Sequence, residues 1–302
     1  MPCYHPLQGY RSQTLTKNGK RKLTFSPQTG YADLPVTVPC GQCIGCRLER
    51  SRQWAIRCVH EASQHLHKCF VTLTYEDASL PAGRTLVKQD FQKFVRALRK
   101  HTGLKIRYFH CGEYGETDQR PHYHAILYGV DFPDKKFYTR NKQQDTVYTS
   151  ETLDRIWSKG KCWIGNVTFE SAAYVARYVL KKVTGDSAID HYKYVDPKTG
   201  EIFDRLPEYI TMSLKPGIGG DWYEKYKGDV YPSDFLVLRG KTMRPAKFYD
   251  RQLEKTDPAA LKKLKFKRIR SASKHKADQT PERLAVRKAV KLSQIKSLSR
   301  NL

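Results

Sequence analysis

The sequence is poor in long apolar runs, and none approaches the ~18 residues that a membrane-spanning helix needs. Its first six residues have neither the basic segment nor the apolar stretch of a signal peptide. A complete nucleotide-binding loop is also missing, because Phe235 stands where the glycine before Gly240-Lys241-Thr242 is required. We therefore expect a cytoplasmic protein that does not enter a membrane and contains no helicase motor.

Acidic residues are scarce relative to basic ones, with 30 Asp and Glu against 55 Lys and Arg, a net charge of +25 in 302 residues. Such a charge attracts polyanions, so nucleic acid is the expected partner, and an anionic membrane surface is the competing interpretation. Residues 255–302 hold 15 Lys and Arg against 3 Asp and Glu, a net +12. We expect this segment to be a nucleic-acid-binding tail, mobile or helical.

Helix-like and strand-like patterns alternate along the middle of the chain. Apolar spacing indicates helices over residues 47–67, 87–101, 153–157 and 171–185, and β-branched and aromatic runs indicate strands over 70–75, 106–111, 122–128 and 162–169. The polar turn at 112–120 makes two of these strands an antiparallel hairpin. Residues 1–40 are expected to be rich in loops, because Gly and Pro interrupt them. We predict an α+β fold with a central antiparallel sheet and packed helices.

Two histidines flank one tyrosine at the start of the strand at 122–128. Since alternate side chains of a strand share a face, His122 and His124 point the same way and can bind one divalent metal ion. Glu113, across the hairpin turn, is the expected third ligand, with Glu116 in reserve. Two imidazoles and a carboxylate leave positions open on Mg²⁺ or Mn²⁺ for a phosphate oxygen.

Tyr174 and Tyr178 lie one turn apart on one face of the helix expected over 171–185. A phenol can exchange with a phosphodiester and hold the product as a phosphotyrosine. Lys181 follows Tyr178 by three residues and can steady the phenolate or the scissile phosphate. A second tyrosine would let one protein cut a strand and then rejoin it, with no need for ATP at this step. The pair can alternatively be ordinary residues at the edge of a core.

These segments resemble the HUH endonucleases, and most closely the rolling-circle replication initiators of the Microviridae. Residues 70–75 look like the first family motif, 121–124 match the metal motif and 174–182 match the two-tyrosine motif. Residues 3–6 and 39–47 look specifically like the gokushovirus branch of these bacteriophages. The resemblance implies a Rep-like sheet related to that of RRM domains, a Mg²⁺ or Mn²⁺ ion, and a nick at the viral origin through a 5′-phosphotyrosine.

The resemblance also suggests how the chain is divided and what it meets in the bacterial host cell. We expect a cysteine-rich segment and helix at 1–66, the HUH nuclease core at 67–190, an extension packed on the core at 191–254, and the basic tail at 255–302. The expected partners are single-stranded and origin DNA, a host helicase that unwinds the duplex, and the host replication machinery.

Three of the eight cysteines form a dense run, Cys40, Cys43 and Cys46, with small glycines between them. Together with Cys3 they could form a four-thiolate structural zinc site, and His5 is an alternative fourth ligand. An iron–sulfur cluster and ordinary reduced thiols are the other interpretations. The remaining cysteines fall inside apolar patterns and are expected in the core.

Other functions stay open on the sequence. A transposase or plasmid relaxase could use the same scaffold, and a non-catalytic nucleic-acid-binding zinc protein could use the same charge. A protein that only binds has no use for the histidine and tyrosine pattern, and the cysteine signature favours the phage initiator.

Overall fold

The computed structural model describes residues 3–17, 19–115, 118–141, 144–178, 182–183, 185–197 and 199–297, without the side chains of residues 177 and 178. The chain forms two compact units. One comprises Met1–Arg50 and Lys265–Arg300, and the other comprises Ser51–Leu264. The second unit holds the central sheet and the paired histidines, so it is described first.

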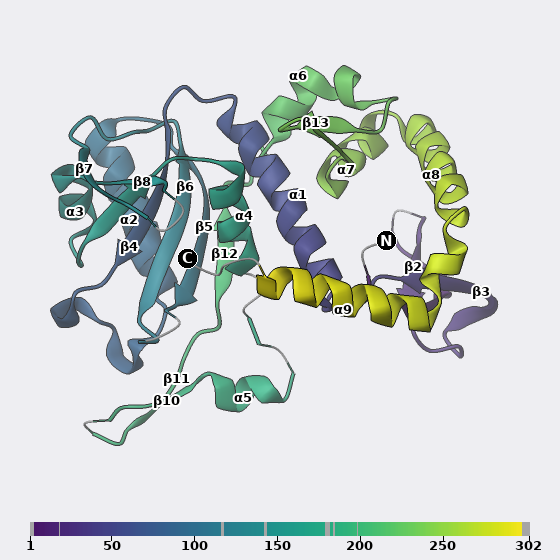
Figure 1. Ribbon diagram of the computed structural model, residues 1–302, viewed down its shortest axis with the longest axis horizontal. Coiled ribbons are helices and arrows are strands. Elements are labelled where there is room, and N and C mark those ends of the chain that lie inside the picture. The colour runs from purple at the N-terminus through teal and green to yellow at the C-terminus, as the bar shows by residue number, and fades with distance from the viewer. Residues whose placement is uncertain are drawn as a thin grey trace. The chain divides into compact units, whose positions relative to one another are not determined.

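The second unit is built on an antiparallel sheet, which has seven strands in the described part of the chain, in the order β12-β5-β6-β4-β9-β8-β7 (Figure 1). The strands are β4 (Lys68–Thr74), β5 (Arg107–Tyr114), β6 (Pro121–Tyr128), β7 (Lys136–Arg140), β8 (Thr146–Thr149), β9 (Cys162–Gly165) and β12 (Tyr209–Met212). Every pairing between them is antiparallel. The prediction of an α+β fold with a central antiparallel sheet is therefore confirmed.

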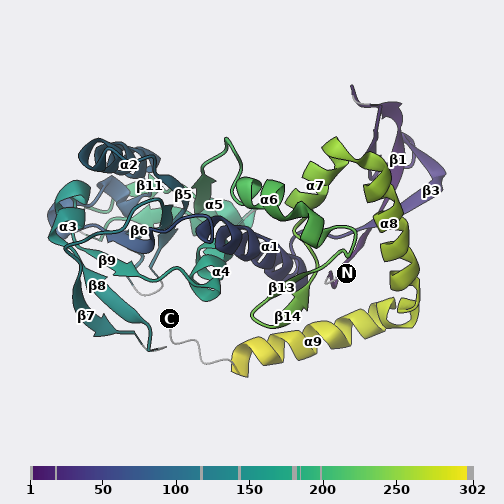
Figure 2. The ribbon, with the colours of Figure 1, turned by 90° about the horizontal axis from the view of Figure 1, so that it is seen from above.

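Helices cover both faces of this sheet (Figure 2). Helices α2 (Lys88–Thr102) and α3 (Glu151–Trp157) pack on one face, where Leu73 and Tyr123 are fully buried. Helices α1 (Ile44–Ala62) and α4 (Phe169–Tyr178) pack on the other, where Phe109 and Ile126 are fully buried. Since alternate residues of a strand face opposite sides, each central strand contributes to both cores.

A glycine in the left-handed conformation ends α2. Gly103 adopts φ 68° and its N–H donates to the Arg99 carbonyl, which closes the helix with a left-handed residue. By contrast, β9 is shorter than the strand expected over 162–169, and α4 begins at Phe169 rather than at Ser171.

The sequence analysis did not predict three strands of the sheet, which are β7, β8 and β12. The hairpin of β7 and β8 has no buried residue, so its sequence carries no apolar alternation. β12 lies far along the chain and pairs with β5, between Tyr209 and Gly112 at one end and Met212 and Phe109 at the other. β12 belongs to residues 191–254, which we expected to be an extension packed on the core, so part of that segment is a strand of the central sheet.

A third core lies elsewhere in the second unit. Helices α6 (Gly220–Val230) and α7 (Lys247–Thr256) enclose Tyr223 and Tyr249, both fully buried, together with Ile56 of α1. The hairpin of β13 (Leu236–Leu238) and β14 (Lys241–Met243) joins the two helices. A separate hairpin of β10 (Lys193–Val195) and β11 (Ile202–Asp204) follows the short helix α5 (Ser187–His191). Short 3-10 turns occupy η1 (Asp77–Ser79) and η2 (Ala82–Arg84).

The first unit contains a three-stranded antiparallel sheet where the sequence led us to expect loops. Its order within the described residues is β2-β1-β3, with bounds Arg21–Thr24, Leu7–Leu15 and Gly30–Val38. Most side chains of these strands are exposed, which explains why the sequence shows no apolar period. Pro35 is tolerated because β3 is an edge strand of this sheet.

The basic C-terminal segment is helical over its described residues. It contains α8 (Pro258–Ser273), η3 (Lys276–Gln279) and α9 (Pro281–Ser297). Leu261 and Leu264 are buried in α8 and Leu284 is buried in α9. Few residues of these helices are buried and many are Lys or Arg, so most of each helix surface is exposed and cationic.

Candidate functional site

Three potential metal ligands meet on one face of the central sheet. In the β5–β6 hairpin, Glu113 lies directly opposite His122, and His124 lies on the same face two residues further along β6. The Nε2 atoms of His122 and His124 lie 2.8 Å and 2.7 Å from the same Glu113 Oε1. The register thus brings together the three residues that the sequence analysis selected as metal ligands, with ligand atoms all within 4.8 Å of one another.

The outer nitrogens of both imidazoles are oriented by neighbouring groups. His124 Nδ1 lies 2.9 Å from the Thr72 hydroxyl, and His122 Nδ1 lies 3.1 Å from the Arg120 carbonyl oxygen. A carbonyl oxygen only accepts, so His122 Nδ1 carries a proton, and any metal ion would be coordinated through Nε2, the nitrogen next to Glu113. A cation between Nε2 and Oε1 would satisfy both groups, which is the arrangement expected of a metal site.

The Glu113 carboxylate is 1% exposed. Burial alone would raise its pKa, but hydrogen bonds from His122 and His124, together with their charge, hold the pKa at about 2. The ligand is therefore ionised at neutral pH. His122 is half-buried rather than buried, so its side of the cluster faces solvent and a substrate can approach from there.

Helix α4 starts with a reciprocal cap. The Thr168 hydroxyl accepts from the Ser171 backbone N–H at 3.1 Å, and the Ser171 hydroxyl accepts from the Thr168 N–H at 2.8 Å. Ala172, Val175 and Ala176 then form the buried stripe that packs on the sheet. This packing fixes which side of the helix faces the histidines.

Tyr174 lies beside the histidine cluster. Its ring centroid is 5.1 Å from that of His124, with the planes nearly perpendicular at 84°. Phe70 of β4 completes this small aromatic group, with centroids 6.3 Å from Tyr174 and 5.6 Å from His124. The helix that carries the tyrosines is thus turned toward the paired imidazoles and not away from them.

The other predicted participants are not placed by these contacts. The backbone of α4 reaches Tyr178, but the Tyr178 side chain, Lys181 and the reserve ligand Glu116 lie outside the described residues. Two neighbours that the sequence analysis did not select are Thr72 and Phe70. Both occupy the half-buried face of β4, whose strict alternation with buried Cys69, Val71 and Leu73 was the available signal.

The first unit holds a second candidate metal centre. The sulfur atoms of Cys3, Cys40, Cys43 and Cys46 lie within 4.8 Å of one another. All are free thiols, and Cys3 Sγ is 3.7 Å from Cys40 Sγ and 3.9 Å from Cys43 Sγ. His5, the alternative fourth ligand, instead lies 2.9 Å through Nε2 from Lys288 Nζ.

Backbone N–H groups converge on three of these sulfurs. Tyr4 donates to Cys43 Sγ, Cys40 to Cys3 Sγ and Cys43 to Cys40 Sγ, each at 3.3 Å. Burial raises the pKa of the Cys43 thiol, but the N–H groups of Tyr4 and Cys46 outweigh it and bring that pKa to about 6. Cys43 therefore favours the thiolate, the form that binds metal, whereas burial raises the pKa of Cys3 and raises that of Cys46 to about 12.

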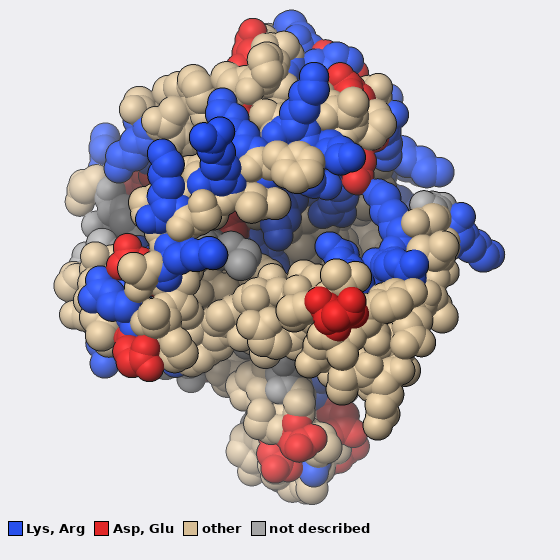
Figure 3. All heavy atoms as spheres, turned by 90° about the vertical axis from the view of Figure 1, so that its right-hand side faces the viewer, with Lys and Arg blue, Asp and Glu red and all other residues tan. Residues whose placement is uncertain are grey.

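On the face drawn in Figure 3, Lys and Arg side chains cover more of the surface than Asp and Glu side chains. In α8 the six basic residues have no acidic neighbour within the helix; they are Lys262, Lys263, Lys265, Lys267, Arg268 and Arg270. Over the described residues, no helix combines the length and apolarity required to span a membrane. A surface with this charge attracts polyanions.

Comparison with known proteins places these features in a family. A family model described as replication-associated protein ORF2/G2P matches residues 68–183, which run from β4 through the Glu113, His122 and His124 cluster to the tyrosine helix. The replication-associated protein VP4 of Bdellovibrio phage phiMH2K is 33% identical over 228 residues, covering 73% of this chain and 68% of that protein.

Two further relatives come from other phages and viruses of bacteria. The replication-associated protein ORF2 of Spiroplasma virus 4 is 34% identical over 234 residues, covering 72% of this chain and 68% of that protein. The replication-associated protein ORF4 of Chlamydia phage 1 is 30% identical over 212 residues, covering 67% and 50% respectively. The chain matches no solved structure. It therefore belongs to the family of phage replication-associated proteins, of the Microviridae type that its motifs predicted.

Proposed function

We propose that this protein initiates rolling-circle replication by nicking and rejoining single-stranded DNA at a phage origin, as an HUH-type endonuclease with a tyrosine nucleophile. The observation that carries the proposal is the Tyr174 ring beside His124, with centroids 5.1 Å apart, on a helix that packs against the sheet face bearing Glu113 and His122. The proposed nucleophile and the proposed ligands of a divalent ion are therefore next to each other, which supports the proposal.

Glu113, His122 and His124 would hold Mg²⁺ or Mn²⁺, which supplies Lewis-acid chemistry by drawing charge off a phosphate oxygen. The phenolic oxygen of Tyr174 attacks the phosphorus and loses its proton. A Tyr–O–P bond forms, the P–O3′ bond breaks, and the departing 3′ oxygen takes up a proton. The product is a 5′-phosphotyrosine and a free 3′-hydroxyl, which a polymerase can extend.

Bond energy is conserved in this exchange, so the reverse reaction rejoins the strand without ATP. Tyr178, one helical turn further on, is the proposed second nucleophile for a new junction while Tyr174 still holds the first end. Lys181 is proposed to steady the phenolate or the scissile phosphate. Because this chain has no complete nucleotide-binding loop, a host helicase and the host replication machinery would unwind and copy the duplex.

The proposal is tested with purified protein, single-stranded phage DNA that carries the origin, and Mn²⁺ without nucleotide. Denaturing gels should show a covalent protein–DNA adduct. Single Phe substitutions at Tyr174 and Tyr178 should each change its yield, and the double variant should lose it. Tyr226→Phe, in helix α6, is a matched control that should keep the adduct. An adduct that persists in the double variant, or a strict need for ATP, would contradict the proposal.

His122→Ala separates chemistry from binding. Cleavage should disappear, because a ligand of the metal is gone. Salt-sensitive DNA binding should survive, because it comes from the Lys and Arg of the surface and not from the ligand set. A native protein that binds DNA and never cuts it under any divalent ion would instead leave a non-catalytic DNA-binding role.

We also propose that Cys3, Cys40, Cys43 and Cys46 hold a structural zinc ion. A tetrahedral site with Zn–S bonds of ~2.3 Å has sulfur–sulfur edges of about 3.8 Å. The separations of 3.7 Å and 3.9 Å in the structure match that edge. The backbone N–H groups of Tyr4, Cys40 and Cys43 donate hydrogen bonds to three of these sulfurs, which would hold them in position for such an ion. The ion would join the segment before β1 to the first turn of α1, all within the first unit.

Metal analysis of the purified protein tests this assignment. Mass spectrometry of the metal content should find zinc in a 1:1 ratio to the chain, and Cys43→Ser should lose it. Cys69→Ser, at a buried cysteine of the sheet, is the control that should retain it. If the protein contains iron and acid-labile sulfide in place of zinc, the site is an iron–sulfur cluster. If it contains neither metal, the four cysteines are ordinary thiols.

A further inference from the structure

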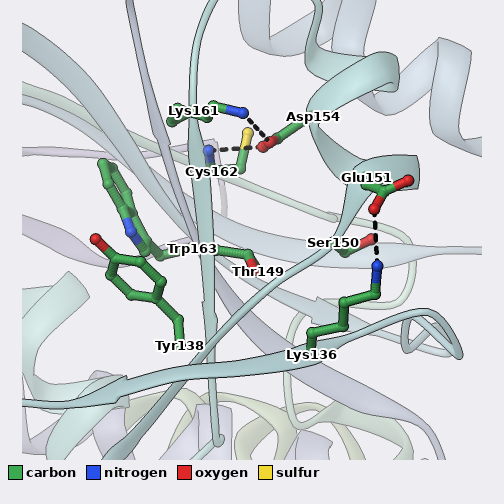
Figure 4. A pocket seen from close by; sticks show the side chains of 9 residues that line it. All are labelled: Lys136, Tyr138, Thr149, Ser150, Glu151, Asp154, Lys161, Cys162 and Trp163. Carbon is green, nitrogen blue, oxygen red and sulfur yellow. Dashed lines mark hydrogen bonds and ion pairs between the residues drawn. The ribbon is translucent and has the colours of Figure 1, made fainter.

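A pocket of about 310 Å³ opens where strands β8 and β9 separate (Figure 4). In the described chain these two strands are paired at Tyr148 and Ile164, and beyond that point β8 turns into α3 while β9 continues along β4. The space between them is lined by side chains of β7, β8, β9 and the start of α3. Its volume is within the usual range of a small-ligand site.

Trp163, one of the residues that line the pocket, lies on the sheet face that bears the candidate metal ligands. Trp163 of β9 pairs with Thr72 of β4, and Thr72 pairs with His124 of β6. Residues that pair across neighbouring strands point to the same face, so these three side chains form one row across the sheet. Two strand spacings separate Trp163 from His124, which is roughly 10 Å.

The lining of the pocket suits a nucleotide. Tyr138 and Trp163 both line the pocket, and in the view of Figure 4 their rings are on one side and the Lys136–Glu151 ion pair is on the other. Tyr138 is 60% exposed although it is a large aromatic residue, so core packing does not explain its presence. Exposed aromatic faces stack on bases, and a cation beside them can contact a phosphate.

Hydrogen-bonding groups complete the lining. Asp154 lies at the pocket, where it accepts from the Cys162 N–H at 2.8 Å and pairs with Lys161 at 3.2 Å. Carboxylates accept from the exocyclic amino groups of bases, and hydroxyls such as that of Thr149 can donate or accept. Ring stacking and edge contacts are therefore available together, which is how unpaired bases are recognised.

We infer that this pocket holds one base of the single-stranded DNA substrate, with Trp163 and Tyr138 as its stacking platform. The inference rests on the proposed function and adds a recognition subsite to it. At ~3.4 Å per stacked nucleotide, roughly 10 Å from His124 corresponds to about three nucleotides from the phosphate at the candidate metal site. A base in a duplex is stacked and paired, so the subsite selects single strands.

Fluorescence anisotropy with labelled single-stranded oligo(dT), with no Mg²⁺ or Mn²⁺ added, tests the subsite without cleavage. Trp163→Leu and Tyr138→Leu should each weaken binding roughly 5- to 150-fold, the range that loss of one base stack gives. Trp163→Phe, which keeps an aromatic face, should bind more tightly than Trp163→Leu. Phe137→Leu is the matched control, because Phe137 precedes Tyr138, is similarly exposed at 63% and does not line the pocket.

Tryptophan emission gives a readout that a merely structural role would not move. Oligo(dT) should quench the emission of the native protein, and Trp163→Leu should lose most of that quenching. If Trp163→Leu fails to fold, Tyr138→Leu still decides, because its side chain is on the surface. Equal affinity of Tyr138→Leu and Phe137→Leu would overturn the subsite. Failure of the native protein to nick DNA, with these binding differences intact, would overturn the proposed nuclease and leave the subsite standing.

Discussion

Replacing Thr72 by valine should weaken divalent-metal binding roughly 10- to 100-fold, which is about 1.4–2.8 kcal/mol. The Thr72 hydroxyl lies 2.9 Å from His124 Nδ1. It can accept the Nδ1 proton, which leaves the Nε2 lone pair directed at the metal position beside Glu113. Valine has the same shape and suits a strand equally well, so the change removes this hydrogen bond and little else.

The magnitude follows from the kind of hydrogen bond that is lost. A neutral hydrogen bond contributes about 1 kcal/mol, and one to a charged group about 1.5–3 kcal/mol. A metal-bound imidazole carries part of the ion's charge, which places this bond in the upper range. The free energy of unfolding of the metal-free protein should change less than the metal affinity, because the Thr72 side chain is only half-buried.

Thr74 provides the matched control on the same strand and face. Its hydroxyl donates to the Lys161 carbonyl at 2.7 Å and not to a histidine, although Thr74 pairs with His122 across the strands. Calorimetric titration with Mn²⁺ should therefore show reduced affinity for Thr72→Val, near-native affinity for Thr74→Val, and recovery in Thr72→Ser. Equal affinities of the two valine variants would refute the role assigned to Thr72.

Three further predictions concern stability. His60 is buried against Tyr249 and Trp222, and burial lowers its pKa to about 4 from an ordinary 6.5. As the pH falls, the unfolded chain therefore takes up a proton at His60 before the folded chain does, and about 2 kcal/mol of folding stability should be lost between pH 7 and pH 5. Thermal melts of His60→Gln should show a smaller loss of stability over the same pH range. Glu61→Gln should cost ~3–5 kcal/mol in urea unfolding, because buried Arg107 loses its ion-pair partner, and Arg107→Met should recover part of this in the double variant. A strong zinc chelator should lower the melting temperature of the native protein and leave that of Cys43→Ser unchanged, whereas equal shifts would contradict a structural ion.

The sequence was enough to select the histidine pair, the tyrosine pair and the cysteine run as candidate sites, because each depends on short-range geometry. A strand places His122 and His124 on one face, and a helix places Tyr174 and Tyr178 one turn apart, whatever the rest of the chain does. Glu113 could also be proposed from its position near the hairpin turn, but the sequence placed it within a turn at 112–120, whereas in the structure β5 continues to Tyr114 and Glu113 lies opposite His122. The α+β class followed from the same local periods.

Longer-range features needed the folded chain. Three features of this kind are the pairing of β12 with β5, the small sheet of β1, β2 and β3, and the exposed hairpin of β7 and β8. Few of their side chains are buried, so the sequence of these strands shows a weak apolar pattern or none. The same holds for partners outside the motifs. Nothing local predicts that Thr72 meets His124 or that Trp163 lies in line with them, because register between separate strands sets those contacts.

The sequence by itself determined which side chains could do chemistry: two imidazoles, a carboxylate, two phenols and four thiols at spacings that local backbone geometry makes meaningful. Tertiary structure alone decided that the Tyr174 ring meets the His124 ring, and that Cys3 reaches Cys40 and Cys43. The physical reason is that periodicity orients neighbours within one element, whereas contacts between elements depend on the buried packing of the whole sheet and its helices.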